Sequence, residues 1–85
     1  MTMMKRETFA IADIYVPVKR RATLKSEVVQ EIAASMLEVG QQTPIMVRQE
    51  ASGRLILVEG LHRLEACKSL GDTTIIGYLV QARKH

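Results

Sequence analysis

A buried strand runs straight into a helix in the second half of the chain, and this junction limits the possible folds more than any other feature. The apolar run at residues 55–58 predicts a buried strand, which ends at Glu59-Gly60. A helical pattern then begins at once and closes at Gly71. The apolar positions of that pattern are Leu61, Leu64, Cys67 and Leu70.

Two basic residues, His62 and Arg63, lie in the first turn of this expected helix. A helix N-terminus has partial positive charge, so cations are disfavoured there by about 0.3–1 kcal/mol. A bound anion such as phosphate would reverse that preference, because free backbone N–H groups and both side chains would converge on it. The alternative without a ligand also stays open: Arg63 is a solvated surface residue, and His62 hydrogen-bonds to a neighbouring carbonyl.

Length and charge favour one small soluble domain. Eighty-five residues leave room for one modest core, and a net charge of +3 permits contact with nucleotides or nucleic acid without requiring it. The one cysteine, Cys67, excludes an internal disulfide and any multi-cysteine metal site. No apolar run approaches the ~20 residues of a membrane span, and no signal peptide opens the chain, so we expect a cytoplasmic protein without a membrane partner.

The remaining patterns alternate between strands and helices in the order β-α-β-β-α-β. This order predicts an α/β (α+β) fold with a mixed sheet, occupying residues 9–80 between a flexible N-terminus (1–8) and a basic tail (81–85). Ser26 is expected to cap the first helix and Gly40 to end it. The expected elements are a strand at 9–16, a basic loop at 18–25, a helix at 26–39, an extended link at 41–44, strands at 45–48 and 54–59 joined by a turn at 50–53, a helix at 61–70 and a strand at 74–80.

Several short motifs, in this order and spacing, make residues 9–80 resemble the N-terminal domain of ParB-type partition proteins, a member of the ParB/sulfiredoxin fold. The motif Thr43-Pro44-Ile45 resembles the Pro-Ile strand of that family. The segment Glu59-Gly60-Leu61-His62-Arg63-Leu64-Glu65-Ala66 stands where partition proteins have Gly-Glu-Arg-Arg-x-Arg-Ala and sulfiredoxins Gly-Gly-Cys-His-Arg. The fold is therefore expected to be that of a ParB/sulfiredoxin-like domain.

Members of this fold bind nucleotide phosphates at that turn: CTP in partition proteins, ATP in sulfiredoxins, and ADP or ATP in free-serine kinases. The resemblance implies that such a ligand, with Mg²⁺ held through its phosphates and Glu59, binds here. The residues it assigns to nucleotide or phosphate binding are Gly60, Leu61, His62 and Arg63 at the turn, Thr43 and Pro44 in a second segment, and Arg20 and Arg21 in the basic loop.

The chain also departs from its relatives. Leu61 stands where sulfiredoxins have a nucleophilic cysteine, and Cys67 falls on the apolar stripe, where a thiol is buried and inert. Glu65 replaces an arginine of the partition motif, which leaves CTP specificity open. The sequence stops at His85, so we expect no helix-turn-helix domain and no helix that reads the major groove.

We therefore expect a stand-alone nucleotide-binding module, linked to DNA partition or regulation, whose partners are a nucleotide and either a nucleic-acid backbone or a DNA-binding protein. Because an 85-residue core is modest, a homodimer is also kept open. One alternative is a phosphotransferase of the free-serine-kinase type with Glu59 and Glu27 as catalytic carboxylates, although a first-turn acid such as Glu27 is also explained by the helix dipole. A ParB-like nuclease is the other alternative, but no dense cluster of carboxylates supports two-metal cleavage.

Overall fold

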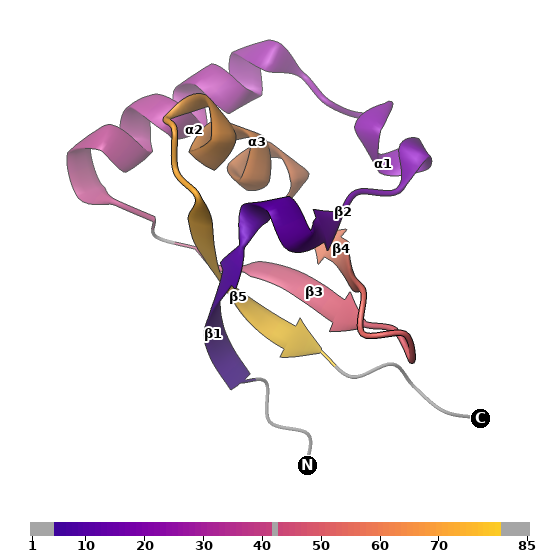
Figure 1. Cartoon of the computed structure of the whole chain (residues 1–85). Coiled ribbons are helices and arrows are strands. Elements are labelled where there is room, and N and C mark those ends of the chain that lie inside the picture. The colour runs from indigo at the N-terminus through magenta and orange to yellow at the C-terminus, as the bar shows by residue number, and fades with distance from the viewer. Residues whose placement is uncertain (1–4, 42, 81–85) are drawn as a thin grey trace.

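A five-stranded mixed sheet with helices on one side forms the domain (Figure 1). The computed structural model describes residues 5–41 and 43–80, and within them the strand order is β1-β5-β3-β4-β2. The β1–β5 and β3–β4 pairs are antiparallel, whereas β5–β3 and β4–β2 are parallel. The expected α+β class with a mixed sheet is confirmed. The strands are β1 (Lys5–Ala10), β2 (Ile14–Tyr15), β3 (Ile45–Gln49), β4 (Leu55–Glu59) and β5 (Thr74–Val80).

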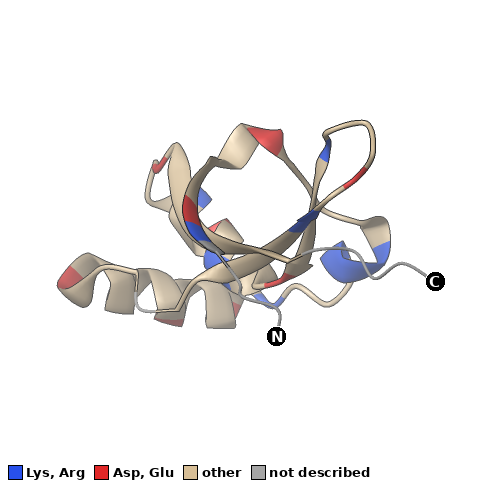
Figure 2. Cartoon of the chain, turned by 90° about the horizontal axis from the view of Figure 1, so that it is seen from below, with Lys and Arg blue, Asp and Glu red and all other residues tan. Residues whose placement is uncertain are grey.

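The entry strand expected at 9–16 is wrong in its bounds, because the chain forms two strands there. Strand β1 starts at Lys5, so residues 5–8 belong to the sheet, whereas residues 1–4 and the expected tail at 81–85 lie outside the described residues. A 3-10 turn, η1 (Ile11–Asp13), separates β1 from β2. The two strands pair at opposite edges of a sheet that curls round (Figure 2), so one straight strand could not serve both.

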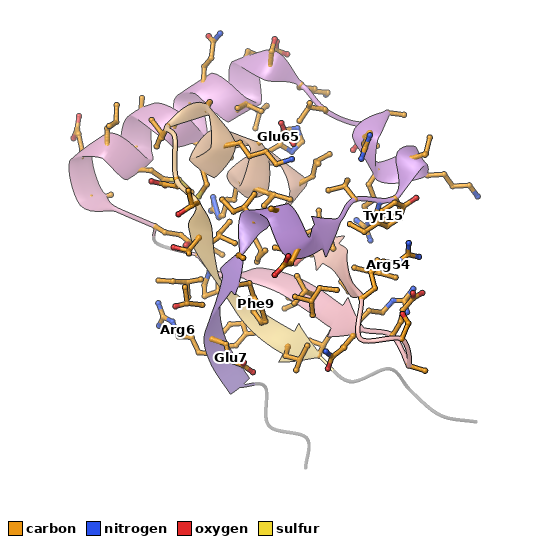
Figure 3. The ribbon with its side chains drawn as sticks, viewed as in Figure 1. Arg6, Glu7, Phe9, Tyr15, Arg54 and Glu65 are labelled. Carbon is orange, nitrogen blue, oxygen red and sulfur yellow. The ribbon has the colours of Figure 1, made fainter. Side chains whose placement is uncertain are left out.

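Strand β2 is only two residues long, and a side-chain contact reinforces its pairing with β4. The guanidinium carbon of Arg54 lies 4.6 Å from the centre of the Tyr15 ring, an arrangement that attracts a cation to the ring face (Figure 3). Arg54 also pairs with Glu50 across the turn between β3 and β4, at 3.3 Å. The turn itself is the one expected, with Gly53 at a φ of 93°.

The helices are arranged in two levels above the sheet (Figure 1). Helix α3 (Leu61–Ser69) buries four side chains and contacts β3 and β5, whereas α2 (Ser26–Val39) packs against α3 and buries none completely. Gly40 ends α2 at a φ of 76°, as expected, but Ser26 is the first helical residue rather than the cap. Lys25 holds the cap position, and no side chain bonds there, because an ammonium group has no acceptor for the free N–H groups of the first turn.

The basic loop expected at 18–25 contains a short helix, α1 (Val18–Arg21). The carbonyl of Pro17 accepts the N–H groups of Arg20 at 3.0 Å and Arg21 at 3.2 Å, which starts one helical turn. A single turn has too little periodicity to be distinguished from a loop by pattern alone. No side chain from Val18 to Glu27 is buried. Among the described residues, no helix is long and apolar enough to span a membrane.

Ile45 lies at the centre of the core and is 1% exposed. A Cβ added at Gly77, its partner on β5, would come within 2.9 Å of the Ile45 side chain, 3.1 Å of its carbonyl oxygen and 3.2 Å of the Phe9 ring. Strand β5 therefore has a glycine where the isoleucine needs room. The other most deeply buried side chains are Leu57, Leu64, Ile75 and Val47.

Candidate functional site

Gly60 forms the turn between β4 and α3, with a φ of 111° and a ψ of 30°. This left-handed conformation favours glycine, and a Cβ there would lie 2.6 Å from Cγ2 of Ile45. The Gly60 carbonyl accepts the first helical N–H, from Leu64, at 2.9 Å. Since no side chain caps α3, the N–H groups of its first turn remain available to a ligand. The strand–glycine–helix junction expected from the sequence is confirmed.

A cavity of about 390 Å³ opens beside this turn, within the range of ~300–1,000 Å³ that is usual for small-molecule sites. Three parts of the chain far apart in sequence surround it: α1 with the start of α2, the link before β3, and the β4–α3 junction. The lining residues are Arg20, Thr23, Val28, Ile32, Thr43, Pro44, Glu59, Gly60, Leu61, His62 and Arg63.

The charges at this cavity are two guanidinium groups and one carboxylate. Arg20 comes from the basic turn of α1 (Figure 2), Arg63 from the first turn of α3, and Glu59 from the end of β4. Within the described residues, the side chains of Arg63 and Glu59 have no ion-pair or hydrogen-bond partner. An arginine that is unpaired and only partly exposed beside a helix N-terminus favours an anionic ligand.

His62 makes a contact that the sequence did not predict. Its Nε2 atom accepts the backbone N–H of Lys25, with 3.1 Å between the two nitrogens. A backbone N–H can only donate, so this bond requires a lone pair on Nε2, which the neutral imidazole with its proton on Nδ1 provides. The ring therefore connects α3 to the residue that precedes α2.

Thr43 and Pro44 are held in place by a residue that sequence reasoning missed. The Gln41 side chain exchanges two hydrogen bonds with the backbone of Ile76: Nε2 donates to its carbonyl at 2.8 Å, and Oε1 accepts its N–H at 2.9 Å. The same Nε2 also donates to the Thr43 carbonyl at 3.0 Å. Gln41 thus acts as a strand partner for β5 just before β3 begins. A polar residue in a link gives no sequence signal for such a role.

Two expected site residues lie outside the cavity lining, namely Arg21 and Glu27. Consecutive helical residues point about 100° apart, so Arg20 and Arg21 cannot both face the same space. Glu27 is in the first turn of α2, whose cavity side consists of Val28 and Ile32. Val28 was missed, although its spacing of four from Ile32 places both on one helix face.

Cys67 is buried, as expected, with 2% of its surface exposed. Burial raises the pKa of the thiol, and the negative charge of Asp72 and a hydrogen bond to it raise it further. The sulfur lies 3.9 Å from the Met36 sulfur, at the contact between α3 and α2. Cys67 is therefore a packing residue and lies apart from the cavity lining.

A second, larger cavity of about 690 Å³ lies between α2 and α3. It is mainly apolar, and its charged residues, Glu65 and Lys68, already pair with each other at 3.3 Å. It lacks the unpaired cations of the first cavity. Within the described part of the chain, no group of three or more His, Cys, Asp or Glu residues could hold a metal ion on its own.

Comparison with models of known protein families identifies the family of this chain. The model of the ParB N-terminal domain matches residues 4–85. The chain belongs to the ParB N-terminal domain family. No match was found among the curated proteins.

Solved structures support the same fold for this ParB N-terminal domain. Sulfiredoxin from Arabidopsis thaliana is 28% identical, with a TM-score of 0.81 over 92% of this chain and 86% of that one. A C-terminally truncated ParB from Caulobacter crescentus, complexed with CTP-gamma-S, is 23% identical, with a TM-score of 0.74 over 95% of this chain. The same truncated protein complexed to the centromeric parS site is 22% identical over 92%, with a TM-score of 0.74. The domain spans 46% and 42% of those two ParB chains.

Proposed function

We propose that this ParB N-terminal domain binds a nucleoside di- or triphosphate, with the phosphates at the Gly60 turn. The observation that supports this most strongly is the convergence of Arg20, Arg63 and the N-terminus of α3 on one cavity. Fixed N–H groups, the helix dipole and two guanidinium groups are the usual means of phosphate recognition. The CTP-gamma-S complex of a ParB with the same fold gives independent support.

The cavity also has surfaces that suit the rest of a nucleotide. Val28 and Ile32 of α2 and Pro44 of the link are apolar side chains that suit a base or a sugar. Mg²⁺ usually binds through one or two carboxylates together with substrate phosphates. Glu59 is the carboxylate of the cavity and would hold the ion, which neutralises phosphate charge when it is bound.

A role in DNA partition or regulation, with a DNA-binding partner, is part of the proposal. The support is the family and the parS complex of the similar ParB, of which this domain spans less than half. A phosphotransferase is less well supported, because it needs two carboxylates and Glu27 lies outside the cavity lining. A nuclease is disfavoured by the same shortage of acidic groups.

Calorimetric titration with CTP, ATP and ADP, each with and without Mg²⁺, tests the proposal. The neighbouring arginines of α1 form a matched pair, because one lines the cavity and the other does not. We expect Arg20→Ala to weaken binding about 10- to 150-fold, the range for a charge-assisted hydrogen bond, and Arg21→Ala to change it less than threefold. Equal effects of the two substitutions, or no binding by the wild type, would contradict the proposed site.

A further inference from the structure

The segment that brings Arg20 to the cavity has few attachments to the rest of the domain. No side chain from Val18 to Glu27 is buried; Val18 is 72% exposed and Leu24 41%. Apolar packing therefore contributes little to the position of this cavity wall. Among the described residues, the hydrogen bond from Lys25 to His62 is the only side-chain bond that ties this segment to another part of the fold.

That bond connects two sides of the same cavity across 37 positions of sequence. His62 lies in the first turn of α3, next to Arg63, whereas Lys25 lies between the cavity residues Thr23 and Val28. Holding the Lys25 amide against α3 thus sets the distance between the Arg20 wall and the Gly60 turn.

The chemistry of the bond requires one protonation state. Only a neutral imidazole has a lone pair on Nε2, and an imidazolium has N–H groups on both nitrogens. After protonation, two N–H groups would face each other 3.1 Å apart, and the bond would be lost. A histidine is the side chain that ordinarily changes charge between pH 5 and 8.

We propose that His62 is a positioning residue, and that its neutral ring holds the Arg20-bearing segment against the phosphate-binding turn. Acid releases this wall of the cavity. The inference rests on the proposed nucleotide site, and it reverses the role expected for a basic residue at that turn. A histidine that contacts phosphate directly binds more tightly when it is charged, whereas a histidine that acts as an acceptor here lowers affinity when it is charged.

Charged groups of both signs lie in the elements around the ring. The cations are Arg20 of α1, Arg63 of α3 and Lys25, whose backbone bonds the ring. The carboxylates are Glu59 at the end of β4 and Glu65, one turn along α3, which already pairs with Lys68. A bound phosphate would attract a charged ring, so the loss of affinity expected in acid is the effect of the broken Lys25 bond after this attraction has been subtracted.

The first test needs no ligand. Nuclear magnetic resonance from pH 5.5 to 8 follows the imidazole of His62 together with the amides of Thr23, Lys25 and Arg20. We expect the Lys25 amide to shift and to lose protection from hydrogen exchange in step with protonation of the ring. Gln places an amide oxygen near the position of Nε2, so the Lys25 amide of His62→Gln should stay protected at all pH values. The proposal would be overturned if the chemical shift and the exchange protection of the wild-type Lys25 amide stay unchanged while His62 titrates.

The second test measures affinity for CTP and ATP at pH 6.0 and 7.5. The phosphate groups of the nucleotide also titrate in this range. Because the same nucleotide is measured with both proteins, the affinity of His62→Gln at each pH corrects for this effect. Relative to His62→Gln, the wild type should lose about two- to tenfold in affinity at pH 6.0, the range for one hydrogen bond. His62→Asn, whose amide is too short to reach Lys25, should bind both nucleotides weakly at both pH values.

Tighter wild-type binding in acid would make His62 a phosphate ligand and overturn the proposal. If neither nucleotide binds at any pH, the proposed function fails. The first test then still shows whether the His62–Lys25 bond depends on the protonation of His62.

Discussion

At the scale of single residues, Gly60 has two separate reasons to be glycine, and they can be measured apart. Its φ of 111° is unfavourable for any L side chain, and a Cβ would also collide with Ile45 at 2.6 Å. Gly71 has a similar φ of 81° but has no atom within 4 Å of an added Cβ. The two positions therefore separate backbone strain from steric overlap.

We expect Gly71→Ala to lower the free energy of unfolding by about 1–2 kcal/mol, the usual cost of left-handed backbone. Gly60→Ala should lower it by about 2–5 kcal/mol, because overpacking of the core adds to that strain. Urea denaturation of both variants measures the difference. Similar losses would mean that Ile45 moves aside easily.

Arg63 is the cavity residue whose removal should most directly weaken binding. Its guanidinium is unpaired within the described residues, so truncation breaks no ion pair of the folded protein. We expect Arg63→Ala to weaken nucleotide binding by about 1.5–3 kcal/mol and to leave the unfolding midpoint almost unchanged. Lys68→Ala, on the same helix but outside this cavity, is the control. Loss of folding in Arg63→Ala would instead indicate a structural role.

Cys67 should resist thiol reagents in the folded state and react once the chain unfolds. Its pKa is raised by burial and by Asp72, so the reactive thiolate is scarce. A raised pKa also means that the folded state keeps its proton longer than the unfolded state. The stability that Cys67 contributes is therefore complete at neutral pH and declines above about pH 8.5, where an ordinary thiol ionises. Between pH 7.5 and pH 9.5, urea denaturation should show a larger loss of unfolding free energy for the wild type than for Cys67→Ala. Rapid labelling of the native protein by a thiol reagent would contradict the burial of Cys67.

At the scale of elements, Gln41 joins the link after α2 to β5. Gln41→Glu keeps the acceptor for the Ile76 N–H but replaces the donor with a carboxylate beside two carbonyl oxygens. We expect it to lower the free energy of unfolding by about 1–3 kcal/mol and to shift the amide resonance of Thr43. In Gln49→Glu an exposed amide-to-carbonyl bond of 3.2 Å is lost instead, which should matter by less than about 1 kcal/mol. Equal losses in both variants would show that the Gln41 bonds are dispensable.

Elements with a long periodic pattern could be predicted, whereas those that depend on the curl of the sheet could not. The apolar stripe of α2, the helix after Gly60 and strands β3, β4 and β5 follow from spacing and from glycine positions. The break at η1 exists because β1 and β2 pair at opposite edges, which is a property of the whole sheet. Likewise, the turn motif identified the Gly60 junction, but the bonds from Gln41 to Ile76 and from Lys25 to His62 join residues more than 30 positions apart.

At the scale of the whole molecule, one cavity collects most of the charged residues assigned to the site but only one carboxylate. Phosphoryl transfer to a hydroxyl needs a metal-binding group and a base close to the acceptor. Glu59 can serve one of these roles, and Glu27 does not line the cavity. We therefore expect the domain to hold the proposed nucleotide without transferring its phosphate.

We expect the protein incubated with ATP or ADP, Mg²⁺ and free serine to form little or no phosphoserine, measured by mass spectrometry. Nucleotide binding under the same conditions provides the positive control. Abundant phosphoserine that disappears in Glu27→Gln would reverse this conclusion, because it would show that Glu27 reaches the reacting groups.

The position of Ile45 between Gly60 and Gly77 also limits how a lineage of such proteins can change. An alanine at Gly77 collides with the Ile45 side chain unless residue 45 has already become smaller, and it still lies tightly against the carbonyl oxygen of residue 45 and the Phe9 ring. An alanine at position 45 that comes first leaves a void that costs about 2–5 kcal/mol. Either order of substitution passes through a less stable ancestor. Gly60 is not relieved to the same degree, since its backbone conformation stays unfavourable for any L side chain. We therefore expect descendants to retain this trio together or to replace positions 45 and 77 in one paired step, with the glycine at the turn inherited unchanged.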